Sequence, residues 1–159
     1  MHYSLRKGAI RMKMEDRTTI LIEISIEELQ PWIDRVKQTT NVHIIKNPKL
    51  GLVMMRAMES VHNDVFNVGE VLVSECSVSV DGQLGYGIVM SQNSSKAEAM
   101  AILDAVSRIQ EGEWSLFYQE FDEWLVLKQH ELRKESLLHF QLIERTRVDF
   151  ELMDQEEEH

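Results

Sequence analysis

The sequence has a single cysteine, Cys76, so no disulfide can form within the chain. One thiol is also too few for an iron–sulfur cluster, which needs about four thiolate ligands. No apolar stretch approaches the ~20 residues of a membrane-spanning helix, and no apolar run of the secretory type follows the basic first residues. These absences predict a cytoplasmic protein that does not depend on disulfides and has no membrane partner.

Positive charge is also scarce. The chain carries 17 Lys and Arg against 27 Asp and Glu, a formal net charge of -10, which disfavours broad binding to nucleic acid or to anionic lipid. A length of 159 residues with 43% hydrophobic residues fits one globular domain with its own core. We expect a lead-in over residues 1–15, a single domain over 16–153 and an acidic tail over 154–159.

The first third of the chain predicts one clear helix. Ser25 is followed three residues later by Glu28, the spacing of a capping box, and apolar residues then recur at helical intervals: Leu29, Trp32, Ile33 and Val36. Pro31 lacks a backbone donor, so we expect a kink or a restart near it. Residues 16–24 are rich in β-branched side chains and are compatible with either a short helix or an extended segment.

The middle third predicts strands joined by hairpins. Asp81-Gly82 is the strongest turn signal in the chain, and alternating apolar residues flank it. We expect strands over 42–46, 52–58, 68–80 and 84–90, a turn over 47–51 and a polar loop over 59–67.

Helices return after the hairpins. Ser95 and Glu98 match a second capping box, and Gly112 predicts the end of that helix. A charged helix is expected over 121–144, and the side chains predicted to be buried are Trp124, Leu125, Leu132, Leu138 and Leu142. Residues 147–153 read as a last strand or an extended arm. This order predicts an α+β fold in which helices cover one side of an antiparallel sheet.

Motifs that carry chemistry are mostly lacking. His130-Glu131 begins like a zinc-protease helix, but Lys134 stands where the second histidine is required, and we expect no metal site. Gly82, Gly85 and Gly87 do not have dinucleotide-binding spacing, so they indicate a tight turn and a close approach of another backbone or a partner. Cys76 shares its strand face with apolar residues and is expected to be a small buried hydrophobe.

Arg56 and Glu70 are the only candidates for a catalytic pair. If the strands over 52–58 and 68–80 pair antiparallel with residue numbers summing to 126, Arg56 lies opposite Glu70, on the side of Leu72 and Cys76. A buried acid with an arginine partner is either a structural ion pair or part of a site, in which Glu70 would be a general base.

An ordered set of short segments resembles the PhnG family of the phosphonate carbon–phosphorus lyase pathway. The match runs from about residue 25 to 153, with departures at Met58, at 60–63 and at 93–96. The matching segments are Gly51-Leu52-Val53 with Arg56, Phe66-Asn67-Val68-Gly69-Glu70, Cys76, Asp81-Gly82 with Gly85-Tyr86-Gly87, Ala97-Glu98 with Ala101 and Asp104-Ala105, and Thr146-Arg147-Val148-Asp149-Phe150 with Met153.

The resemblance implies a subunit rather than a self-sufficient enzyme. The resemblance implies that the chain joins PhnH, PhnI and PhnJ subunits in a core complex. It also implies that the chain acts with PhnH, PhnI and PhnL subunits to replace the adenine of ATP by a phosphonate. The resemblance therefore implies ATP as a co-substrate of the assembly and no cofactor bound by this chain alone. Candidate contact residues are Gly51, Gly69, Glu70, Cys76, Gly82, Gly85, Gly87, Thr146, Arg147 and Phe150. The alternative is a stand-alone homodimer that binds a small molecule or has a regulatory role.

Overall fold

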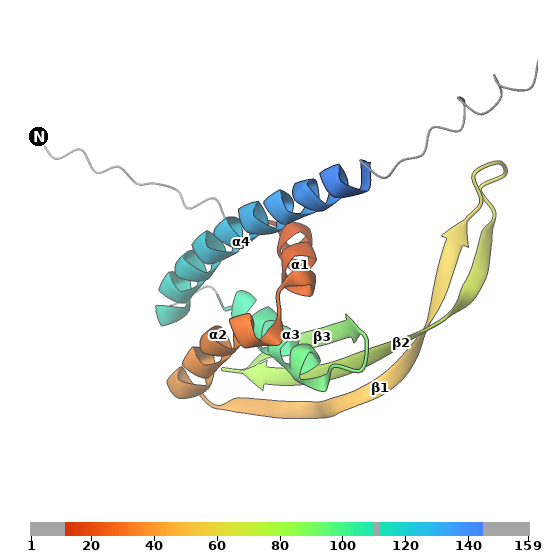
Figure 1. Ribbon diagram of the computed structural model, residues 1–159. Helices are drawn as coiled ribbons and strands as arrows, with labels where there is room; N and C mark the ends of the chain where they lie inside the picture. The colour runs from red at the N-terminus through yellow and green to blue at the C-terminus, as the bar shows by residue number, and fades with distance from the viewer. Residues whose placement is uncertain (1–11, 110–111, 145–159) are drawn as a thin grey trace, which may run out of the picture.

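The computed structural model describes residues 12–109 and 112–144, which form an α+β fold as predicted. The sheet is antiparallel with strand order β1-β2-β3, and the helices lie on one of its faces (Figure 1). In chain order the elements are α1 (Met14–Glu23), α2 (Ile26–Thr39), β1 (Val42–Met58), β2 (Val65–Val80), β3 (Gln83–Met90), α3 (Ser94–Ser107) and α4 (Glu113–Glu144).

Helix α3 packs directly onto the backbone of β3. A Cβ atom at Gly85 would lie 2.1 Å from the carbonyl oxygen of Ala101, and one at Gly87 would lie 1.9 Å from that of Ala97. Both distances are far inside van der Waals contact, so only glycine fits at either position. The predicted close approach of another backbone is therefore confirmed, and that backbone belongs to the chain's own helix.

The turn between β2 and β3 confirms the strongest signal in the sequence. Asp81 and Gly82 both have positive φ, 47° and 80°, and Val80 pairs with Gln83 across them, as in a type I′ hairpin. The Asp81 carboxylate accepts hydrogen bonds from the hydroxyl of Thr40 and from Nε1 of Trp114, the latter at 2.9 Å. The turn is thereby fixed to the end of α2 and the start of α4.

The early helices follow the sequence in part. Ser25 caps α2, and its hydroxyl accepts from the backbone N–H of Glu28 at 3.3 Å. The helix runs through Pro31 without restarting, because a proline in the second turn removes only one backbone bond. Residues 16–24, which were open between helix and strand, lie mostly in α1, and that helix begins earlier, at Met14.

The strands are longer than predicted. The turn expected over 47–51 is wrong, because β1 runs through it with register shifts between Ile44 and Lys46 and between Lys46 and Lys49. Pro48 is tolerated there because β1 is an edge strand with irregular pairing, where a missing N–H costs little. The polar loop is also shorter than predicted, because β2 begins at Val65.

The second capping box and two helix limits are wrong. Asn93 caps α3, and its side chain accepts from the backbone N–H of Lys96 at 2.9 Å. That helix ends at Ser107, and α4 begins at Glu113. The buried residues of α4 lie near its start, where aromatic side chains of α4 pack against Trp32 of α2. Leu125 is buried, Trp124 and Leu132 are partly buried, and the predicted burial of Leu138 and Leu142 is wrong.

A buried ion pair connects α1 to α4. The Arg17 guanidinium donates to Asp122 at 2.9 Å, and both side chains are almost completely buried. The same guanidinium lies over the ring of Tyr118, with its central carbon 4.8 Å from the ring centroid. This contact joins two residues 105 positions apart and holds α1 against α4.

Candidate interaction surface

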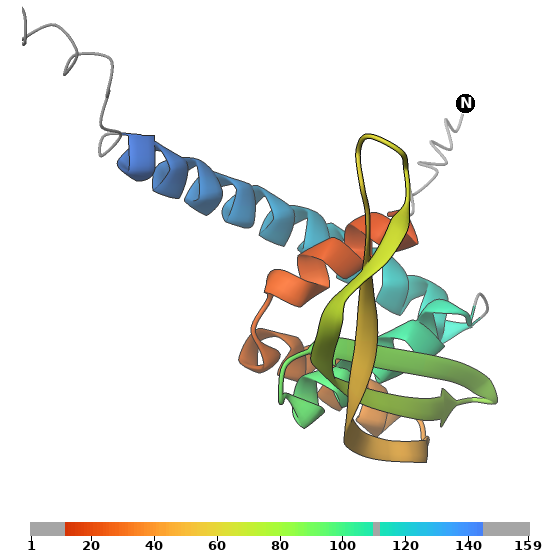
Figure 2. The ribbon, with the colours of Figure 1, turned by 90° about the vertical axis from the view of Figure 1, so that its right-hand side faces the viewer.

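Half of the β1–β2 pair extends beyond the helical layer. We call this segment the β-arm; it comprises residues 51–58 of β1, the connection 59–64 and residues 65–72 of β2. It curves away from the sheet toward the side on which the helices lie (Figure 1), and in the rotated view it passes in front of α1 and rises above it (Figure 2). Only two strands form the arm, because β3 pairs with β2 from Val73 onward.

Apolar side chains of the β-arm are exposed on both of its faces. A two-stranded hairpin without cover is marginally stable in water, and large exposed apolar areas mark binding surfaces. The exposed large hydrophobic residues are Leu52, Val53, Met54, Met55, Met58, Val61, Val65, Phe66, Val68 and Leu72.

The two faces of the β-arm differ in charge. Residues directly opposite each other in an antiparallel pair point to the same face, so the register assigns each side chain. The outer face, continuous with the uncovered face of the sheet, comprises Gly51, Val53, Met55, Ala57, Phe66, Gly69 and Val71. The inner face, continuous with the helix-covered face, comprises Leu52, Met54, Arg56, Met58, Val65, Asn67, Glu70 and Leu72. Among these described residues, charge occurs on the inner face alone.

The outer face continues from the arm onto the sheet. Tyr86, Ile88 and Met90 of β3 are exposed there and lie opposite Ser77, Glu75 and Val73. At the base of the arm Glu75 accepts from Lys46 at 2.7 Å, and Lys49 lies 3.5 Å away. These lysines lower the pKa of Glu75, and Glu75 raises the pKa of Lys46. The charged side chains at the base of the arm are therefore paired with each other. Beyond this base, the strand residues of the outer face are uncharged.

The predicted Arg56–Glu70 pair is wrong in register and in burial. Glu70 lies opposite Met54 and Arg56 opposite Asn67, because the actual register differs from the one assumed by two to three residues. Both side chains are exposed on the inner face of the arm. Within residues 12–109 and 112–144 no ion pair joins Arg56 to Glu70, and neither side chain has the buried surroundings that were expected.

We call the described residues outside the β-arm the body. The remaining predicted residues are divided between the body and the β-arm. Cys76 is buried, as predicted; its thiol lies 3.4 Å from the carbonyl oxygen of Lys46, and burial raises its pKa. Gly82 is in the hairpin turn. Gly51 and Gly69 lie on the arm, where an added Cβ would meet ordinary contacts at Gly51 and open space at Gly69. Thr146, Arg147 and Phe150 lie outside the described residues.

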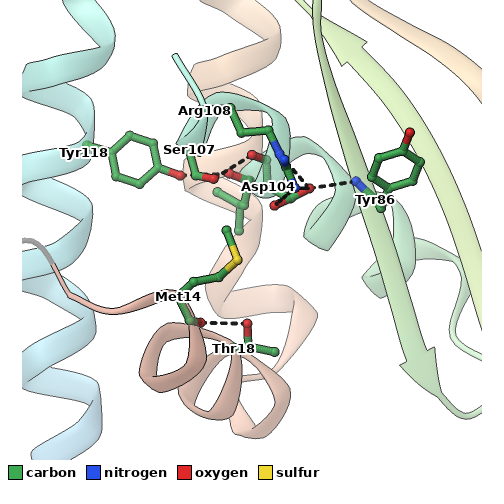
Figure 3. A network of polar contacts seen from close by, with 8 residues as sticks. Met14, Thr18, Tyr86, Asp104, Ser107, Arg108 and Tyr118 are labelled. Carbon is green, nitrogen blue, oxygen red and sulfur yellow. Dashed lines mark hydrogen bonds and ion pairs between the residues drawn. The ribbon is translucent and has the colours of Figure 1, made fainter. Parts of the chain in front are cut away.

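Asp104 has a role that the sequence did not suggest beyond the family resemblance. Its carboxylate accepts from the backbone N–H of Tyr86 at 3.0 Å and pairs with Arg108 at 3.0 Å (Figure 3). Close by, the hydroxyl of Tyr118 donates to the carbonyl oxygen of Leu103. Asp104 therefore occupies a backbone donor on the free edge of β3, which hinders the addition of another strand there.

The sequence of the β-arm contains a run of consecutive apolar residues, which a search for alternating apolar and polar residues does not detect. Leu52 to Met55 are four consecutive apolar residues, a pattern typical of strands buried on both faces. In the part of the chain that the structure describes, nothing covers either face of the arm, and no His, Cys, Asp and Glu side chains gather as three or more potential metal ligands. None of the described helices is long and apolar enough to cross a membrane.

Two comparisons with known proteins relate this chain to a protein family. The family model described as "Phosphonate metabolism protein PhnG" matches residues 13–155. A protein of Rhizobium meliloti (strain 1021), named "Alpha-D-ribose 1-methylphosphonate 5-triphosphate synthase subunit PhnG", is 31% identical over 88 residues. That match covers 55% of this chain and 56% of the relative, little more than half the length of either.

Proposed function

The chain belongs to the PhnG family, and we propose that it is a non-autonomous subunit of an alpha-D-ribose 1-methylphosphonate 5-triphosphate synthase. The family match over residues 13–155 carries the proposal, because it includes both the body and the β-arm. In this role the chain supports phosphonate breakdown within the carbon–phosphorus lyase system.

The reaction proposed for the assembly is a substitution at the ribose of ATP. A phosphonate oxygen forms a bond to C1 of the ribose, the glycosidic bond to adenine breaks, and adenine leaves with a proton. The triphosphate stays on the 5-position, so ATP is a co-substrate of the assembly. We propose no cofactor bound by this chain alone.

Two features of the described residues support a subunit role over independent catalysis. Glu70 and Arg56 are solvent-exposed on a projecting arm, whereas a general base works best in a site that excludes water. Exposed apolar residues on the β-arm and along the far half of α4, including Leu138, Phe140 and Ile143, resemble the surfaces that permanent complexes bury.

The proposed partners are PhnH-, PhnI-, PhnJ- and PhnL-like subunits, and the proposed location is the cytoplasm. Co-expression of the tagged chain with these subunits tests the assembly, and the mass of the purified complex gives its composition. Adenine release from ATP and methylphosphonate tests the activity. We expect release with the full set and none when this chain is left out. Undiminished release without the chain would refute the proposal.

The alternative of a stand-alone homodimer predicts a different outcome of the same experiment. The purified chain would have twice its monomer mass and would bring down none of the co-expressed subunits. Glu70→Gln distinguishes the third hypothesis, in which Glu70 is a general base. Because Glu70 is exposed on the arm, we expect the assembled complex with Glu70→Gln to keep its adenine-release rate.

A further inference from the structure

We propose that the outer face of the β-arm is the centre of the surface by which this chain docks onto a non-identical subunit. The matching surface of that subunit is apolar, uncharged and concave. This inference rests on the proposed function and adds to it the face that is bound and the chemistry that binds it.

Charge distinguishes the outer face of the β-arm from its inner face. Val53, Met55 and Phe66 are exposed on the outer face, and the described outer face of the arm has no charged residue. Protein interfaces place uncharged, apolar residues at the centre and charged residues at the rim. The outer face therefore has the composition of an interface centre, and Arg56 and Glu70 on the inner face have that of a rim.

Among the described residues, the β-arm also lacks the cover that would stabilise it in the isolated chain. Two strands without cover are marginal in water, yet Val53, Met55 and Phe66 are exposed on their outer face. An uncovered ribbon of this kind invites aggregation unless a partner protects it. Burial of the outer face against another apolar surface covers these side chains and stabilises the two-stranded arm.

The shape of the arm and the charge of the chain indicate which kind of partner fits the outer face. The arm bends toward the helix side, so its outer face is convex (Figure 1). Two copies of a convex face touch along a narrow line, whereas a concave groove encloses it. The chain also has a formal charge of -10, which makes two copies repel each other. Shape and charge together favour a different subunit over a second copy.

Neighbouring methionines provide a matched test. Met55 on the outer face and Met54 on the inner face are 45% and 47% exposed, so aspartate at either position costs the isolated arm a similar amount. Phe66 and Val65, at 51% and 62%, form a second pair on β2. Each Asp variant is co-expressed with tagged PhnH-, PhnI- and PhnJ-like subunits, and its affinity for the purified partner complex is measured after its melting temperature has been checked.

We expect Met55→Asp and Phe66→Asp to weaken binding by at least roughly 30-fold, as a buried charge at an interface centre does. Met54→Asp and Val65→Asp should change it by less than about threefold, as at an interface rim. Equal losses for both faces, or no loss at all, would overturn the inference while the subunit role stands. A wild-type chain that binds none of the subunits refutes the subunit role itself. A homodimer that Met55→Asp dissociates identifies the occupant as a second copy and overturns the choice of partner.

Discussion

The body and the β-arm share two continuous strands, β1 and β2, but different contacts stabilise the strands in the two regions. Under α3 the strands are covered by a helix that touches the sheet backbone at Gly85 and Gly87. Beyond Val73, toward the tip of the arm, the described strands β1 and β2 pair only with each other. The difference indicates that the body carries the stability of the isolated chain, whereas the arm exposes the apolar surface that we propose a partner binds.

The largest expected effect is in the body, at the Arg17–Asp122 pair. Asp122→Ala leaves a buried guanidinium without its carboxylate, and we expect the free energy of unfolding to fall by about 3–5 kcal/mol. Urea denaturation measures the change. The control is the double variant Arg17→Met/Asp122→Leu, which removes both charges and should recover most of the loss; failure to recover it would contradict the assignment of the loss to an unpaired charge.

The next effect separates a glycine of the body from a glycine of the arm. Gly87→Ala forces a Cβ into the backbone of α3, and we expect a loss of about 3 kcal/mol as the helix is displaced. Gly51→Ala is the matched control, because its Cβ would lie 3.7 Å from the nearest atom of Glu75. Thermal unfolding compares the two. Similar melting temperatures for the two variants would contradict the expected difference in packing between Gly87 in the body and Gly51 in the arm.

Hydrogen exchange distinguishes the body from the arm within a single strand, β2. In β2 the amides of residues 74–80 lie between two strands, and those of 66–71 have one neighbour. We expect the arm amides to exchange at least roughly 100-fold faster in the isolated chain, because they open locally without global unfolding. Exchange followed by mass spectrometry measures this, and added partner subunits should slow the arm selectively. Uniform exchange along β2 would mean that the arm is as stable as the body.

The smallest effect is the acid dependence of the pair at the base of the arm. Lys46 lowers the pKa of Glu75 below its ordinary value of 4.5 in the folded chain. The resulting stabilisation is present above 4.5 and is lost as the pH falls through the lowered folded-state value. Denaturation midpoints of the wild type and Glu75→Gln should differ slightly at pH 7 and converge at lower pH, while Glu70→Gln serves as the unpaired control. A difference that grows on acidification would contradict the pairing.

Local signals in the sequence predicted local structure well. The Asp81-Gly82 hairpin and the Ser25 cap depend on adjacent residues, and both are confirmed. Gly85 and Gly87 predicted a close backbone, although the sequence left open whether it belonged to the chain or to a partner. Such features follow from the conformational preference or the size of one or two residues.

Features that depend on distant residues were missed. The register of β1 and β2 is altered by three irregularities, and each one moves the partner of every following residue, so the Arg56–Glu70 pairing could not be found by counting. Arg17 and Asp122 are too far apart in the chain for spacing to connect them. Leu138 and Leu142 have the pattern of buried residues, but the pattern does not say whether the chain or a partner covers them.

The contact between α1 and α4 has a consequence for the order of assembly during translation. Helix α1 is synthesised first, but Asp122, its buried partner, leaves the ribosome about 100 residues later. The β2–β3 hairpin and α3 form from neighbouring segments and need not wait. Domains form as their parts emerge, at roughly 5–20 residues per second, so α1 remains undocked for several seconds. Helix α1 is therefore synthesised before the other described helices but is among the last to dock.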